Sequence, residues 1–187
     1  KRRNRKQVPF PSERGRIPNR VSIEKRPTYI EKRKQAGHWE GDSMVSRHSR
    51  AGLNTLVERA TGLVKISKLT NLSAGETQRA VTARLLPLPA GLRRTLTTDN
   101  GKENGNHELV GKEVNLQWYF CHPYASHERG TNENTNGLIR QYFPKGTDFA
   151  TVNAADIQFV ADRLNNRPRK RLKYKTPNEA FTRQVVR

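Results

Sequence analysis

In the middle of the chain, two kinds of apolar pattern alternate. In one kind the apolar residues recur at every second position, and in the other they recur with the period of a helix. In one strand-like run Val64 and Ile66 alternate with Lys65 and Ser67, which predicts a strand with one buried face. The turn-forming residues 59–62 join this run to the apolar run before it and indicate a hairpin. The expected strands cover residues 41–47, 52–58, 63–69, 94–98 and 116–120. The first three of them would form a meander.

Helix signals separate and follow these strands. Ser73 and Glu76 have the spacing of a capping box, so a helix begins after Ser73 and stops before Pro87. Asn153 is the expected cap of the last helix, whose apolar residues recur at i, i+3, i+4 and i+7, and Thr131 can cap the helix before it. The expected helices cover residues 74–86, 107–113, 131–143 and 154–167. The resulting order, β-β-β-α-β-α-β-α-α, predicts a mixed α/β body.

The positive charge of this 187-residue chain is confined to its two ends. Lys and Arg number 36 against 17 Asp and Glu, and of the net charge of +19 residues 1–37 hold +10 and residues 163–187 hold +8. The middle of the chain is nearly neutral. The distribution predicts a basic arm over residues 1–36, a folded core over 37–167 and a basic tail over 168–187.

Both basic ends offer groups suited to a phosphate backbone. They contain apolar or aromatic residues, such as Phe10 and Tyr174, that a purely solvating tail lacks, so nucleic acid is the expected partner. An acidic membrane surface fits less well, because neither end has an amphipathic stripe. The cations expected to contact DNA are Lys1, Arg2, Arg3, Arg167, Arg169, Lys170, Arg171 and Lys173.

Several classes of protein are excluded by what the sequence lacks. The single cysteine, Cys121, cannot form an internal disulfide, and the histidines lack the spacing of a zinc site. No apolar run reaches the roughly 18 residues of a membrane span, and no apolar signal segment follows the basic start. No phosphate-binding G-x-x-x-x-G-K-[ST] motif is present, so ATP use is not indicated. We expect a soluble, intracellular protein, and the missing initiator Met indicates a piece of a longer one.

Three acidic residues stand where a mixed sheet would gather them. Asp42 lies in the first strand, Asp99 follows the fourth, and Glu133 lies in the first turn of a later helix. If the first and fourth strands are neighbours, the two aspartates meet at one sheet edge and the helix delivers the glutamate. Three carboxylates suit two Mg²⁺ ions roughly 4 Å apart, which promote in-line phosphoryl displacement. Taken singly, each acid is more simply a turn residue, a helix-dipole partner or a strand end.

Around these acids the sequence resembles the transposases of the insertion-sequence-thirty family. The likeness covers roughly residues 17–182, and its motifs lie at 37–42, 96–103, 128–146, 164–170 and 175–181. The chain departs from the family at two places beside the acids. His127 stands where a Trp is usual, and Asn104 and Gly105 follow the Asp-Asn-Gly-Lys-Glu run where an apolar aromatic is common.

The resemblance implies a ribonuclease-H-like catalytic core, an α/β fold with a mixed sheet flanked by helices. Its Asp-Asp-Glu triad maps onto Asp42, Asp99 and Glu133, and the last two are separated by the implied 33 residues. The implied activity is Mg²⁺-dependent cleavage of transposon ends and joining of the freed 3′-hydroxyl to target DNA, with Mn²⁺ as a substitute ion. Asp42 would bridge both ions, with Asp99 on one and Glu133 on the other. The resemblance implies a helix-turn-helix region before this core, and we expect that region to lie outside this sequence.

Further residues are expected to support the triad. Asn136 and Arg140 share a helical face with Glu133 and would orient that glutamate or contact a phosphate. The other supporting residues expected are His38, Asn100 and His107. The implied partners are double-stranded DNA, as transposon ends and target, and further copies of the chain, because two ends must be joined together. The expected location is the bacterial cytoplasm, on the DNA of the nucleoid.

Two other interpretations stay open. A retroviral-type integrase or a structure-selective nuclease would use the same kind of triad, and a nuclease would nick DNA without joining it. A non-catalytic basic DNA-binding protein would use its acids only to tune its surface and would bind no divalent ion.

Overall fold

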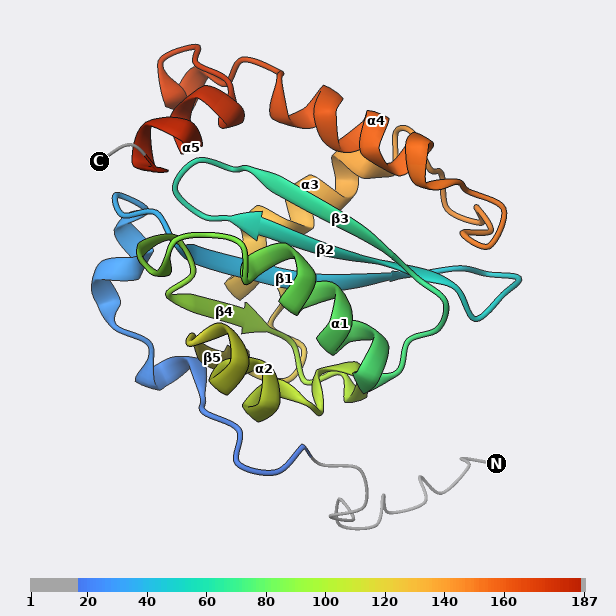
Figure 1. Ribbon diagram of the computed structural model, residues 1–187, viewed down its shortest axis with the longest axis horizontal. Coiled ribbons are helices and arrows are strands. Elements are labelled where there is room, and N and C mark those ends of the chain that lie inside the picture. The colour runs from blue at the N-terminus through green and yellow to red at the C-terminus, as the bar shows by residue number, and fades with distance from the viewer. Residues whose placement is uncertain (1–16, 186–187) are drawn as a thin grey trace, which may run out of the picture.

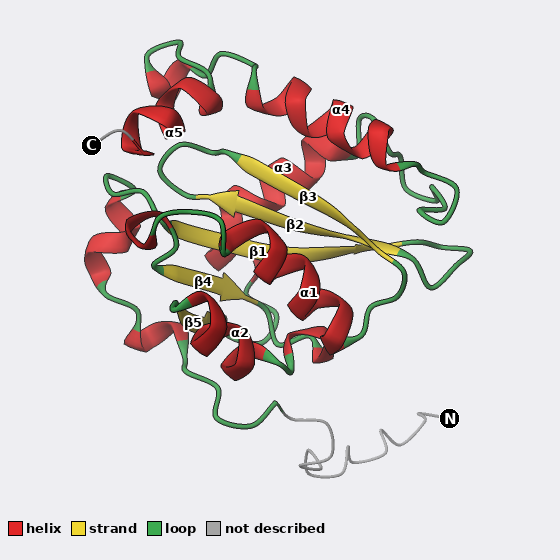
Figure 2. Ribbon diagram, in the orientation of Figure 1, coloured by secondary structure: helices red, strands yellow, loops and turns green. Residues whose placement is uncertain are grey.

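Five strands form one mixed sheet in the order β3-β2-β1-β4-β5 (Figures 1 and 2). The computed structural model describes residues 17–185. The strands are β1 (His38–Val45), β2 (Gly52–Glu58), β3 (Val64–Leu69), β4 (Thr95–Thr98) and β5 (Gln117–Phe120). The first three pair antiparallel as a meander, and β4 and β5 continue the sheet parallel to β1. The predicted mixed sheet of a meander plus two strands is confirmed.

Helices cover both faces of this sheet. They are α1 (Ala74–Leu85), α2 (His107–Val114), α3 (Gly130–Ile139), α4 (Ala154–Asn165) and α5 (Pro177–Val185). In Figure 1, α1 and α2 lie in front of the sheet and α3 lies behind it. Buried side chains of α1 and α2 share one apolar cluster with Trp39 and Leu96, whereas those of α3 and α4 share another with Leu53 and Val57. Because both faces are covered, β2 is buried along its whole length, and the prediction of one buried face for the hairpin holds only for β3.

Local capping accounts for two helix starts and not for a third. The Ser73 hydroxyl accepts from the amide of Glu76 at the start of α1, and the Asn153 side chain does the same for Asp156 at the start of α4, as predicted. Thr131 is not a cap, and that prediction was wrong. The α3 helix begins one residue earlier, directly after the 3₁₀ helix Ser126–Arg129, so Thr131 lies inside the first turn.

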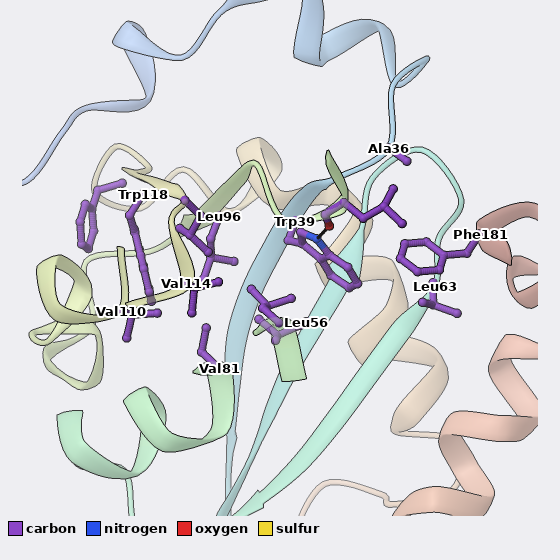
Figure 3. Packing of buried hydrophobic residues seen from close by; sticks show 14 of the residues in the cluster. Ala36, Trp39, Leu56, Leu63, Val81, Leu96, Val110, Val114, Trp118 and Phe181 are labelled. Atoms are coloured by element: carbon purple, nitrogen blue, oxygen red, sulfur yellow. Dashed lines mark hydrogen bonds between the residues drawn. The ribbon is translucent and has the colours of Figure 1, made fainter. Parts of the chain in front are cut away.

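The basic tail expected over 168–187 contributes to the core instead of standing apart from it. Its helix α5, which the sequence pattern did not predict, places Phe181 edge-to-face against Trp39 with ring centroids 6.0 Å apart (Figure 3). The indole nitrogen of Trp39 donates to the carbonyl of Leu92 at 2.9 Å. The apolar cluster thus joins the tail to the centre of the sheet.

The described part of the expected arm, residues 17–36, also packs on the core. Ile17 and Ile30 are buried, and Ser22 forms a parallel bridge with Phe120 beside β5. Residues 17–36 thus contact the core, and the domain boundary at residue 36 stays a prediction. Lys1, Arg2 and Arg3 lie outside the described residues. Among residues 17–185, every helix is too short or too polar to cross a bilayer.

Candidate active site

The pairing of β1 with β4 brings two of the three predicted acids to one place. The strands run parallel, with Glu40 of β1 opposite Thr97 of β4. Asp42 and Asp99 each lie two residues further along and on the same face of the sheet, because side chains alternate along a strand. The two aspartates are 57 positions apart in sequence, and only this parallel pairing makes them neighbours.

One arginine links the two aspartates. The guanidinium of Arg129, which ends the 3₁₀ helix before α3, contacts Asp42 Oδ1 at 2.9 Å and Asp99 Oδ2 at 3.4 Å. It also donates to the carbonyl of Gly41 at 3.0 Å. Burial disfavours its charge, but the carboxylates of Asp42 and Asp99 outweigh this effect and raise the pKa of Arg129. The guanidinium therefore stays charged and offsets the repulsion between the two acids.

Neutral donors hold the other oxygen of each aspartate. Asn136 of α3 donates from Nδ2 to Asp42 Oδ2 at 2.8 Å, and its own Oδ1 accepts from the Thr55 hydroxyl at 3.1 Å. Asn104 and the backbone amide of Gly101 donate to Asp99 Oδ1 at 3.2 and 3.1 Å. Each carboxylate thus has one oxygen held by neutral donors, which we call its outer oxygen. The other, its inner oxygen, contacts Arg129.

Glu133 does not contact this pair. It lies on α3 three residues before Asn136, and its side chain is exposed. Within residues 17–185, no group of three or more His, Cys, Asp or Glu side chains is close enough to hold a metal ion. The structure therefore joins Asp42 with Asp99, and the triad with Glu133 stays a prediction.

The aspartate pair fits a hard divalent cation. Mg²⁺ is commonly held by one or two protein carboxylates and completes its shell with water and substrate phosphate oxygens. A cavity of about 510 Å³ opens beside Asp99 and is lined by residues 99–101, residues 121–125 and Arg129. Tyr124, one of the residues that line this cavity, has a side chain fully exposed to solvent. The donor set and the adjoining space suit a metal-bound phosphodiester.

The predicted supporting residues divide into those near the acids and those elsewhere. Asn136 touches Asp42, as described. Asn100 follows Asp99 and donates to the carbonyl of Cys121 at 2.7 Å, which ties the loop after β4 to the end of β5. Asn100 thus lies at the carboxyl ends of β4 and β5, whereas Asn136 reaches Asp42 from α3.

His38 is not with the acids, although it shares their face of the sheet. It begins β1, four residues before Asp42, a distance of about 13 Å along a strand. Its ring nitrogens lie 2.9 Å from Thr95 Oγ1 and 3.3 Å from Gln35 Oε1. Burial, reinforced by the nearby Arg94, lowers the pKa of His38 to about 4, so the ring is neutral.

His107 and Arg140 also stand apart from the acids. His107 starts α2 on the other face of the sheet and packs edge-to-face on Phe120 at 5.0 Å. Arg140 turns toward the end of α3, where it lies 5.7 Å above the ring of Phe149 and within 3.3 Å of the carbonyl of Pro144. The expected role of Arg140, to orient Glu133 or contact a phosphate, stays a prediction.

The C-terminal cations lie at the opposite end of β1. Arg171 donates to the carbonyl of Ala60 in the turn between β2 and β3 at 2.8 Å, and burial together with Arg33 lowers its pKa. Arg169 is half-buried, whereas the other four cations are exposed, namely Arg167, Lys170, Arg171 and Lys173. These side chains form a basic surface far from the aspartate pair.

Three residues with a bearing on the site were missed by sequence reasoning. Arg129 and Glu40 both lie within the family motifs, but a buried charge is indistinguishable from a surface one in a single sequence. Glu103 follows Asp99 closely, and burial together with the carboxylates of Asp99 and Asp42 raises its pKa. The aspartate pair is thus surrounded by more charge than the three predicted acids.

The sheet order and the flanking helices define a ribonuclease-H-like α/β fold. Two solved structures share this fold at 17% identity and a TM-score of 0.62. The catalytic core domain of BIV integrase matches over 79% of this chain and 95% of its own. A chain of the simian T-cell lymphotropic virus intasome in complex with the PP2A regulatory subunit B56 gamma matches over 78% of this chain and 54% of its own. No family model matches the sequence.

Sequence relatives are more specific. The chain is 44% identical over 173 residues to the transposase for insertion sequence element IS4351 of Bacteroides fragilis. This match covers 92% of this chain and 52% of the relative. It is 43% identical over 176 residues to transposase InsI for IS30A of Escherichia coli strain K12, over 93% of this chain and 46% of the relative. The chain is thus a relative of the insertion-sequence-thirty transposases, as its motifs predicted, and spans about half the length of the curated relatives it matches.

Proposed function

We propose that this chain is the catalytic core of a DNA transposase that cleaves transposon ends and joins the freed 3′-hydroxyl to target DNA. The observation that supports this function is the pair Asp42 and Asp99, gathered by parallel strands at the edge of an integrase-type fold. Relatives at 44% and 43% identity are transposases, which favours this chemistry over other uses of the fold.

In this proposal Asp42 and Asp99 hold a divalent cation, Mg²⁺ with Mn²⁺ as a substitute, and Glu133 completes a two-ion site from α3. Two such ions, when bound, make the attacking oxygen more nucleophilic and stabilise the charge on the leaving oxygen. The protein fixes the acids before substrate arrives, since Asn136 and Asn104 anchor their outer oxygens. Preorganised carboxylates avoid rearrangement during the reaction.

The proposed substrate is double-stranded DNA, both as transposon end and as target. The cations Arg167, Arg169, Lys170, Arg171 and Lys173 would neutralise backbone phosphates, which makes binding strongly dependent on salt. Joining two ends requires more than one copy of the chain, and no ATP is needed because the reaction exchanges one phosphodiester for another. Such an enzyme would work on the nucleoid in the bacterial cytoplasm.

A strand-transfer assay tests this function. Asp42→Ala and Glu133→Gln, each placed in the protein that carries this chain, should reduce Mg²⁺-dependent joining of a labelled transposon end below detection. DNA binding should stay within about twofold, because neither residue belongs to the basic surface. Arg79→Gln is the matched control, since Arg79 is an exposed residue of α1.

Each other product pattern contradicts the proposal in a distinct way. Nicked DNA without joined product would indicate a structure-selective nuclease of the same fold. No product together with no divalent binding by calorimetry would indicate a non-catalytic DNA-binding protein. Normal joining by Glu133→Gln would remove Glu133 from the triad and leave the aspartate pair.

A further inference from the structure

Arg129 occupies the inner side of the aspartate pair. Its two terminal nitrogens reach Asp42 Oδ1 and Asp99 Oδ2, which are the two carboxylate oxygens that Asn136 and Asn104 leave free. The Arg129 side chain is only 10% exposed, whereas those of Asp42 and Asp99 are 25% and 42% exposed. A buried cation thus reaches two acids that are open to solvent on their other sides.

The inner oxygens can exchange one cation for another, because other donors hold the carboxylates in place. Asn136, Asn104 and the Gly101 amide are neutral and would hold the carboxylates in place whichever cation lies between them. The contact from Arg129 to Asp99, at 3.4 Å, is longer than a strong charge-assisted hydrogen bond. A divalent ion bound to the same oxygens would meet the positive charge of the guanidinium at close range, and the two would repel.

We propose that Arg129 is an exchangeable counter-ion of the aspartate pair, which a divalent cation must displace in order to bind. The inference rests on the proposed function, because it takes Asp42 and Asp99 as the metal-holding acids. Without metal, the guanidinium of Arg129 offsets the repulsion between the two adjacent carboxylates and holds them close together. With metal, the guanidinium leaves their inner oxygens.

The displacement acts on the helix that carries Glu133. Arg129 directly precedes Gly130, the first residue of α3, and Glu133 lies in the first turn of that helix. Release of Arg129 removes a side-chain tie between this turn and the end of β4. Metal binding at the two aspartates is therefore coupled to the position of the third predicted acid, which makes Arg129 a positioning residue for Glu133.

Calorimetry with MnCl₂ or MgCl₂ alone tests the exchange. Arg129→Gln should bind the metal about tenfold more tightly than the native chain, the equivalent of about 1.4 kcal/mol, because no guanidinium has to be displaced. Its metal-free melting temperature should fall, and the rise on adding metal should exceed that of the native protein. Arg129→Lys, which keeps the charge but cannot reach both acids through a fork, should lie in between.

Two controls separate the inference from the function on which it rests. Asp42→Asn should lose metal binding in both the native and the Arg129→Gln background, and Arg79→Gln should behave as native. Loss of this dependence on Asp42 would overturn the proposed metal site. Metal binding that depends on Asp42 but is equal or weaker in Arg129→Gln would overturn the exchange alone.

A spectroscopic measurement covers the case in which Arg129→Gln does not fold. The side-chain nitrogen resonances of Arg129 in the native protein should shift on titration with Mg²⁺ as the guanidinium leaves the acids. Resonances that stay unchanged at saturating metal would show that Arg129 keeps its contacts, and the exchange would be wrong.

Discussion

Two arginine–carboxylate clusters lie on the same face of β1, two residues apart, and differ mainly in their exposure. At the amino end Arg59 pairs with Glu40 at 2.7 Å, and these side chains are 2% and 0% exposed. At the carboxyl end Arg129 pairs with Asp42 and Asp99, which are open to solvent. The same chemistry therefore serves two purposes. The closed cluster holds elements together, and the open one leaves its carboxylates accessible to solvent.

The closed cluster joins parts of the chain that are distant in sequence. Arg59 also contacts Glu31 at 2.8 Å in the segment before β1, and Glu31 pairs in turn with Arg26. The second oxygen of Glu40 accepts the backbone amide of Asn132 at 2.8 Å, inside the first turn of α3. Every charge in this cluster thus has a structural partner, and the helix that carries Glu133 is held by one of them.

The largest expected effect follows from breaking the closed cluster. Glu40→Gln leaves the Arg59 charge without its buried partner and should lower the free energy of unfolding by about 3–5 kcal/mol. Urea unfolding monitored by circular dichroism measures the change. Arg79→Gln, which removes an exposed ion pair on α1, should change it by less than about 1 kcal/mol. A loss below about 1 kcal/mol for Glu40→Gln would show that burial does not distinguish the two clusters.

A smaller effect on the free energy of unfolding is expected when the pH is lowered, because of His38 near the closed cluster. Burial and the cations Arg94, Arg59 and Arg26 lower the pKa of His38 from 6.5 to about 4. In the unfolded chain His38 takes up a proton as the pH falls below 6.5, while the folded protein keeps it neutral. The stability that His38 contributes above pH 6.5 is therefore lost as the pH falls toward 4, by roughly 3 kcal/mol. The unfolding free energy of His38→Gln should depend less steeply on pH over this range, and an equal slope would contradict the assignment.

The smallest effect on stability is expected at the open cluster. Asp99→Asn removes a carboxylate that is 42% exposed and 3.4 Å from Arg129, so the free energy of unfolding should change by less than about 1 kcal/mol. The same substitution should abolish strand transfer if the proposed function is right. A large loss of stability would mean that Asp99 serves the fold in the way that Glu40 does.

The elements that could be predicted from sequence depend on neighbours along the chain. Ser73 and Asn153 cap helices through residues three positions away, and the acid pair needed only the correct pairing of two strands. Phe181 and Arg129 depend on distant partners, Trp39 and the two aspartates, and no local pattern marks them. Charge alone does not show which basic residues are buried. The sequence therefore predicts phosphate-contacting cations at the chain ends and at Arg140, and does not mark Arg129, which lies between the acids.

The parallel pairing of β1 with β4 also fixes when the acid pair can exist during synthesis of the chain. The meander β1–β3 uses only residues 38–69, so all three of its strands are translated before β4. The aspartates become neighbours only after β4 has emerged, and their supports Arg129 and Asn136 follow still later. The contacts of the acid pair can therefore form only after Arg129 and Asn136 have been translated, later than all three strands of the meander.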